Sequence, residues 1–165
     1  MLAIAIFSII NVVLLVAKTG TYFLFSAYVP FFLTDLGMYL CGMSPDYYYE
    51  SANAFEFLPG NFFAIMLGIS IAIIVLYLIC YWFARKDKLG WLITGLVLFI
   101  IDTAALFFLA GLNASFIIDY VFHAWALFSL IRGISNLKKV LNAPTNTVFD
   151  EAENGTEGPA PEESM

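Results

Sequence analysis

Three apolar runs in this sequence are each long enough to cross a lipid bilayer. They extend from Asn61 to Phe83, from Trp91 to Leu112 and from Ser115 to about Gly133. A spanning helix needs about 20 mostly apolar residues, at about 1.5 Å per residue. The composition agrees, because 62% of the 165 residues are hydrophobic and only 12% are charged, whereas a soluble domain is about half apolar and about a quarter charged. The sequence therefore predicts an all-α fold, a polytopic transmembrane helical bundle with short loops.

The N-terminal part contains two more apolar segments, residues 2–17 and 22–40, separated by the short polar stretch from Lys18 to Thr21. Together they are about twice as long as one span needs. Either one helix protrudes far from the membrane, which gives four spans in the whole chain, or the chain turns at Gly20 and five spans result. The first segment is short for a span, and it could instead lie partly in the interface.

The positions of the basic residues distinguish these two topologies, because short cytoplasmic loops of membrane proteins are enriched in Lys and Arg. With five spans and the N-terminus outside, all the basic residues fall on the cytoplasmic side: Lys18, Arg85, Lys86, Lys88, Arg132, Lys138 and Lys139. With four spans and the N-terminus inside, Lys18 lies in the membrane or outside it. We therefore expect five spans, with the N-terminus outside and the C-terminus in the cytoplasm. The short loops and small size favour the plasma membrane of a bacterium.

The C-terminal tail, residues 142–165, is acidic. The formal net charge of −6 is accounted for by its six acidic side chains: Asp150, Glu151, Glu153, Glu157, Glu162 and Glu163. The tail is rich in Pro, Gly, Glu and Ser and has almost no large apolar side chains, so it cannot bury enough surface to offset its ordering entropy. We predict a disordered cytoplasmic tail after a membrane domain of residues 1–141. The alternative is an acidic docking segment.

Two lines of small or polar residues could bring spans together, because lipid provides no hydrophobic drive between helices and close backbone approach must hold the bundle. In the third span, Ala64, Gly68 and Ala72 recur every four residues. In the second span, steps of three and four place one line of residues on one face: Tyr22, Ser26, Pro30, Thr34, Gly37 and Cys41. This second line predicts a packing seam or a polar pathway. We also expect Pro30 to kink the helix, because it removes the hydrogen bond to the carbonyl of Ser26.

Three ionisable residues lie inside the fourth and fifth predicted spans: Asp102, Asp119 and His123. A carboxylate at bilayer depth costs roughly 2.5–3.5 kcal/mol on insertion scales, so these side chains must face protein or a polar cavity. Asp102 precedes Asn113 by eleven residues and His123 follows it by ten, which puts both roughly 15–17 Å from the turn between these spans, near the midplane. Asp119 is one helical turn before His123 on the same face. We expect a column of Asp119, His123 and Asp102 that descends from the outside.

This column is compatible with several chemistries. A carboxylate beside an imidazole could form a proton relay or supply a general base. Two carboxylates and an imidazole could also hold a metal ion, although the spacing alone is a weak signal. A negative site at the midplane could instead bind a cationic substrate or a coupling ion. The structural interpretation is that Asp102 and His123 only bond to each other and fix the hairpin, with Asp119 solvated at the outer edge.

An enzyme is disfavoured, because the sequence places no Ser or Cys beside His123, and Ser26, Ser70 and Ser129 could approach it only through tertiary packing. Motifs for cofactors, paired metal-binding cysteines and phosphate loops are absent, so we expect no cofactor and no nucleic-acid partner. The sequence favours a non-catalytic accessory or regulatory membrane subunit that contacts the lipid bilayer and forms a homo-oligomer or joins a larger membrane protein. The alternative is a small transporter or an ion- or proton-coupling protein.

Overall fold

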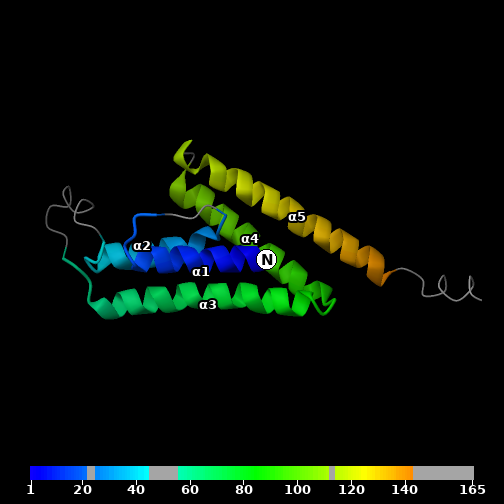
Figure 1. The fold of residues 1–165 in the computed structure, drawn as a ribbon, viewed down its shortest axis with the longest axis horizontal. Helices are drawn as coiled ribbons and strands as arrows, with labels where there is room; N and C mark the ends of the chain where they lie inside the picture. The colour runs from blue at the N-terminus through cyan, green and yellow to red at the C-terminus, as the bar shows by residue number, and fades with distance from the viewer. Residues whose placement is uncertain (22–24, 45–55, 112–113, 143–165) are drawn as a thin grey trace, which may run out of the picture.

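The computed structural model of the chain describes residues 1–21, 25–44, 56–111 and 114–142. In that part the chain forms five α-helices and a short 3-10 helix (Figure 1). In chain order the elements are α1 (Leu2–Val16), α2 (Tyr28–Leu40), α3 (Gly60–Ala84), α4 (Leu89–Ala110), η2 (Ala114–Phe116) and α5 (Ile117–Leu141). The predicted all-α fold is confirmed.

Three of these helices, α3, α4 and α5, are long and apolar enough to cross a membrane. They have 25, 22 and 25 residues, which corresponds to about 33–38 Å against about 30 Å of hydrocarbon. Large apolar side chains cover their outer faces, and Phe108 and Val121 are 89% and 65% exposed. Such a surface is stable in lipid and not in water. The chain is therefore a small multi-pass membrane protein.

The first two helices are shorter than the sequence predicted. α1 has 15 residues and α2 has 13, about 22 Å and about 20 Å, so neither has the length of a span. α2 begins only at Tyr28, because Ala27 before it is extended (φ −69°, ψ 137°) and Phe25 has a positive φ of 82°. The turn predicted at Gly20 is present, and this residue adopts a φ of 67° that glycine tolerates best.

α2 packs antiparallel on α3. Near the end of α2, Gly37 lies against Met66 in the first part of α3. One turn earlier in α2, the hydroxyl of Thr34 bonds to the hydroxyl of Ser70 at 3.0 Å. Later residues of α2 therefore lie beside earlier residues of α3.

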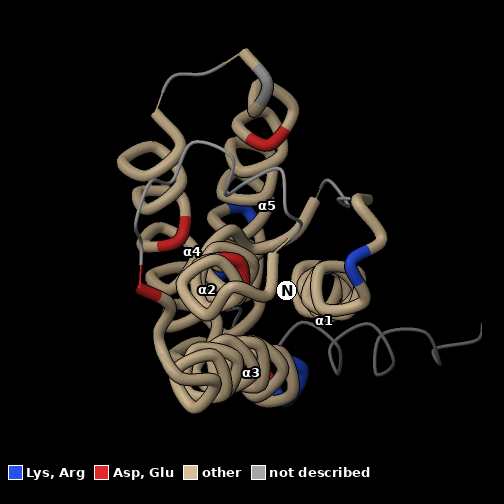
Figure 2. Tube along the Cα trace, turned by 90° about the vertical axis from the view of Figure 1, so that its left-hand side faces the viewer, with Lys and Arg blue, Asp and Glu red and all other residues tan. Residues whose placement is uncertain are grey.

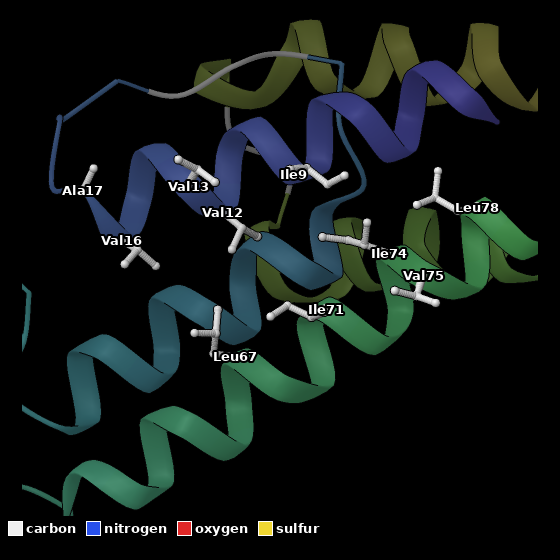
Figure 3. A pocket seen from close by; sticks show the side chains of 10 residues that line it. All are labelled: Ile9, Val12, Val13, Val16, Ala17, Leu67, Ile71, Ile74, Val75 and Leu78. Carbon is white, nitrogen blue, oxygen red and sulfur yellow. The ribbon is translucent and has the colours of Figure 1, made fainter.

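α1 is also antiparallel to α3, and it therefore runs in the same direction as α2. Figure 3 shows Val16 beside Leu67 and Ile9 beside Ile74. At the other end of α1, the side chain of Met1 lies against Gly95 in α4. The chain that connects α1 to α2 consequently returns along the bundle before α2 begins (Figure 1).

This arrangement corrects the predicted five-span topology, in which the first two helices are antiparallel and the N-terminus lies opposite to the C-terminus. Met1 lies in the same half of the bundle as the turn between α3 and α4, and Gly133 in the last part of α5 approaches Leu92 near the start of α4. Ala17 lines a groove together with Leu67 in the first part of α3, so Lys18, which follows Ala17, lies at the opposite end of the bundle. Lys18 and the basic residues of the α3–α4 turn therefore lie at opposite ends of the bundle. The sequence did not reveal the direction of α1, because an apolar run gives the length of a helix and not the direction in which the helix runs.

The interior of the bundle is built around α2, with α3 and α1 packed beside it (Figure 2). Its largest fully buried apolar side chains include Phe99 and Leu106 of α4. On α2, the residues Pro30, Thr34 and Gly37 are all buried, and they face neighbouring helices as a packing seam would. The other predicted line differs, because its members are all exposed: Ala64, Gly68 and Ala72. A Cβ added at Gly68 would meet nothing within 4 Å.

Some predictions fall on residues that the structure does not describe. The predicted disordered tail lies outside the described residues from residue 143 onward. Tyr22, the first member of the line predicted on the second span, lies outside them as well.

Candidate functional site

Asp102 of α4 binds the start of α2 inside the bundle. Its carboxylate accepts the backbone N–H of Tyr28 through Oδ2 at 2.9 Å and that of Val29 through Oδ1 at 2.8 Å. Asp102 is 2% exposed. The first N–H groups of a helix have no partner within the helix, and they carry a partial positive charge that favours a nearby anion. Asp102 therefore caps α2 from another helix.

Every N-terminal position of α2 that would need a hydrogen-bond partner is satisfied. Ala27, which precedes the helix, donates its N–H to Oγ of Ser8 in α1 at 2.9 Å. The next two N–H groups, of Tyr28 and Val29, go to Asp102. The fourth position is Pro30, which has no N–H to satisfy. This short helix can therefore begin in an apolar interior without leaving a backbone donor orphaned.

This finding corrects the predicted role of Pro30. The sequence suggested a kink in the middle of a long helix that began near residue 22. Pro30 instead occupies the first turn of α2, where its fixed φ fits the helix and its missing N–H costs nothing. The helix begins later than expected because Asp102 and Ser8 supply the capping acceptors from α4 and α1.

His123 of α5 joins the same carboxylate. Its Nε2 lies 3.0 Å from Oδ2 of Asp102, and its Nδ1 lies 2.8 Å from the backbone oxygen of Asp119. The ring stacks on Phe99 of α4, with the ring centroids 4.9 Å apart and an interplanar angle of 9°. His123 is 1% exposed. Hydrogen bonds at both ring nitrogens and stacking on one face of the ring determine its position.

The hydrogen bonds of His123 fix the number of protons on the pair. The backbone oxygen of Asp119 can only accept, so Nδ1 of His123 carries a proton. The contact between Nε2 and Oδ2 of Asp102 needs one further proton, on either atom. Imidazolium with carboxylate and imidazole with carboxylic acid both have no net charge. The pair is neutral as a unit, which lowers the cost of placing it among apolar helices.

Asp119 takes a different place from the one predicted. The structure brings Asp102 and His123 together, whereas the contact between Asp119 and His123 is made by the backbone oxygen of Asp119. The side chain of Asp119 is not solvated at an edge, because the residue is 2% exposed. The structure therefore joins Asp102 to His123 through their side chains and Asp119 to His123 through its backbone oxygen.

Two residues of α1 belong to this polar centre and were not singled out in the sequence. Ser8 accepts the N–H of Ala27 and donates to the backbone oxygen of Ile4 at 2.7 Å. Asn11 donates through Nδ2 to Oγ of Ser26 at 2.6 Å. Ser8 and Asn11 are three residues apart on an otherwise apolar helix, and this i, i+3 spacing was the available signal.

The arrangement limits the chemistry that these residues can perform. No group of three or more His, Cys, Asp or Glu side chains able to hold a metal ion occurs within the described ranges. The serines considered as nucleophiles are each bonded elsewhere: Ser26 to Asn11, Ser70 to Thr34 and to the oxygen of Met66, and Ser129 to the oxygen of Trp125. The geometry joins four helices through buried hydrogen bonds: α1, α2, α4 and α5.

Comparison with models of protein families, with curated proteins and with solved structures finds no match for this chain. The fold and the polar centre define its class as a small multi-pass membrane protein in which a buried Asp–His pair holds a short internal helix.

Proposed function

We propose that this protein is a non-catalytic accessory or regulatory membrane subunit, and that its buried polar centre maintains the fold on which a partner docks. The observation that carries this proposal is the double contact of Asp102 with the start of α2. Both carboxylate oxygens bind backbone N–H groups, and one of them also contacts His123.

These contacts favour a structural role over a transport role for Asp102. A coupling carboxylate must exchange partners or protons during each cycle. If Asp102 released its partners, two backbone donors would be left unbonded in an apolar interior, and each buried unsatisfied donor costs about 1–3 kcal/mol. A carboxylate that closes a helix end is thus poorly suited to a role that needs repeated release.

The second candidate is a small transporter or an ion- or proton-coupling protein. Its support is the short helix α2, whose N-terminus meets a polar centre inside the bundle. Transporters often place their substrate or ion at such interrupted helices near the midplane. In this chain, however, the helix end is directed at an internal carboxylate.

We further propose that the chain acts with a homo-oligomeric copy or a larger membrane protein in a bacterial plasma membrane. The support for a partner is the outer face of α3, where Ala64, Gly68 and Ala72 are exposed and would allow another helix backbone to approach closely. The positive-inside rule supports a cytoplasmic location for the end that carries six of the seven basic residues, which includes the C-terminal end of α5. Under this orientation Lys18 faces the outer side.

The test is to purify the full chain in mild detergent and to measure which proteins or solutes remain bound in the wild type and in Asp102→Asn. Thr103→Val is the matched control, because Thr103 is adjacent in sequence and bonds only within its own helix, to the oxygen of Phe99. The accessory role predicts that Asp102→Asn lowers the yield of folded protein while the partner bound per folded chain stays constant. A cation or solute that is bound by the wild type and the control, and is lost from folded Asp102→Asn, would instead establish the transport role.

A further inference from the structure

An apolar groove runs between α1 and α3, apart from the polar centre (Figure 3). Its volume is about 570 Å³, within the range of roughly 300–1,000 Å³ of small-molecule sites. Aliphatic side chains line it, among them Val12, Val13 and Val16 of α1 and Leu67, Ile71 and Val75 of α3. These α3 residues belong to the middle of a membrane-spanning helix, so an occupant has to be apolar.

The cationic residue Lys18 lies at one end of this groove. Lys18 directly follows Ala17, which lines the groove, and Lys18 is exposed. Within the described ranges the ion pair found is the one between Asp102 and His123, so Lys18 has no ion-pair partner there. The basic residues of the α3–α4 turn lie at the opposite end of α3. Among the described residues, Lys18 therefore provides a positive charge without an ion-pair partner beside an apolar groove.

The depth of Lys18 allows its ammonium group to reach the headgroup layer. Ala17 lines the groove together with Leu67, which is seven residues from Gly60 and thus about 10 Å along α3. Since α3 is about 37 Å long and the hydrocarbon layer is about 30 Å thick, this level is roughly 7 Å below the hydrocarbon boundary. A lysine near a helix end extends its apolar stem over such a depth and places its charge at the interface.

We propose that this groove binds one acyl chain of an anionic glycerophospholipid whose headgroup phosphate pairs with Lys18. The groove supplies aliphatic contacts along the chain, and Lys18 supplies the charge that selects the headgroup. A helix of a second copy would fill the groove with side chains, but it would leave the charge of Lys18 without an anion. The lipid is the occupant that satisfies both features of the site.

The experiment measures lipid retention by native mass spectrometry of the full chain, purified in mild detergent and supplied with dioleoylphosphatidylglycerol or with dioleoylphosphatidylcholine. Lys18→Gln removes the charge, and Ile71→Trp fills the groove. Lys138→Gln and Val97→Trp are the matched controls, because Lys138 is a basic residue of the last turn of α5 and Val97 is an exposed residue of α4 outside the groove.

We expect the wild type to retain one phosphatidylglycerol molecule more strongly than any phosphatidylcholine. Lys18→Gln should weaken this retention about fivefold, which corresponds to about 1 kcal/mol per basic residue near a lipid surface. Ile71→Trp should abolish retention of that molecule, and both controls should keep it. Equal retention of the two lipids, an equal effect of Lys138→Gln, unchanged retention in Lys18→Gln, or a dimer without bound lipid would each overturn the proposal. Lys18→Gln changes an exposed side chain, so the charge test does not depend on the folding of Ile71→Trp.

Discussion

The carboxylate of Asp102 bonds to the backbone of Tyr28, 74 residues away in the sequence, at the first residue of α2. A capping residue ordinarily lies next to the helix that it caps. Here α3 and the first half of α4 lie between α2 and its capping residue in the sequence. α2 therefore acquires a defined start only when α4 is packed beside it. The same carboxylate holds His123, and one residue thereby links α2, α4 and α5.

We predict that Asp102 and His123 are energetically coupled. Asp102→Asn keeps one acceptor but leaves one of the two α2 N–H groups unbonded, and this costs about 1–3 kcal/mol. His123→Phe preserves a ring against Phe99 and removes both hydrogen bonds.

A double-mutant cycle on the free energy of unfolding in detergent should give a coupling energy of about 1 kcal/mol or more, within the range of roughly 0.5–3 kcal/mol seen for contacting residues. Asp102→Asn combined with Ser129→Ala is the control, because Ser129 is exposed and bonds only to Trp125. The effects of these two control substitutions on the free energy of unfolding should be additive within about 0.5 kcal/mol. Additivity in the Asp102 and His123 cycle would contradict the contact.

We predict that Pro30→Ala destabilises the protein. The substitution adds a backbone N–H in the first turn of α2, where Asp102 and Ser8 already serve the other donors, and a buried unbonded donor costs about 1–3 kcal/mol. The kinked-helix hypothesis predicts the opposite, because alanine would restore a bond to the carbonyl of Ser26. Thermal unfolding in detergent distinguishes the two. Pro59→Ala is the control and should have little effect, because Pro59 is exposed before α3.

We predict that two glycine substitutions have different effects. A Cβ at Gly37 would lie 2.9 Å from Cβ of Met66, so Gly37→Ala should push α2 away from α3 at a cost of about 1–3 kcal/mol. A Cβ at Gly68 would meet nothing within 4 Å, so Gly68→Ala should leave the stability of the monomer unchanged or raise it by up to about 1 kcal/mol. Unfolding midpoints of the two variants test this, and equal midpoints would refute the α2–α3 packing.

We predict that the end of α1 and the end of α2 face the same side of the membrane. Single cysteines at positions 19, 43 and 86, in a background where Cys41 and Cys80 are replaced by alanine, can be labelled in sealed vesicles with a membrane-impermeant reagent. Thr19→Cys and Met43→Cys should react from one side and Lys86→Cys from the other, because α1 and α2 are both antiparallel to α3. Labelling of positions 19 and 86 from the same side of the membrane would instead support the predicted five-span topology.

The sequence by itself determined the class of the protein and the depth of its polar residues. Apolar length identified α3, α4 and α5 as spans, because a helix must cover the hydrocarbon thickness. Counting residues from the turn near Asn113 placed Asp102 and His123 at the same level, because the rise per residue of a helix is constant. Length and rise are local properties, and the sequence records them directly.

Only the tertiary structure decided how the N-terminal third is arranged. Both apolar segments were recognised, but the start of α2 at Tyr28 depends on acceptors from Ser8 and Asp102, which lie on two other helices. The direction of α1, the place of Pro30 in a first turn and the backbone contact of Asp119 follow from the same packing. A helix end in an apolar interior forms where partners for its free N–H groups are brought together, and in this chain those partners come from segments far apart in sequence.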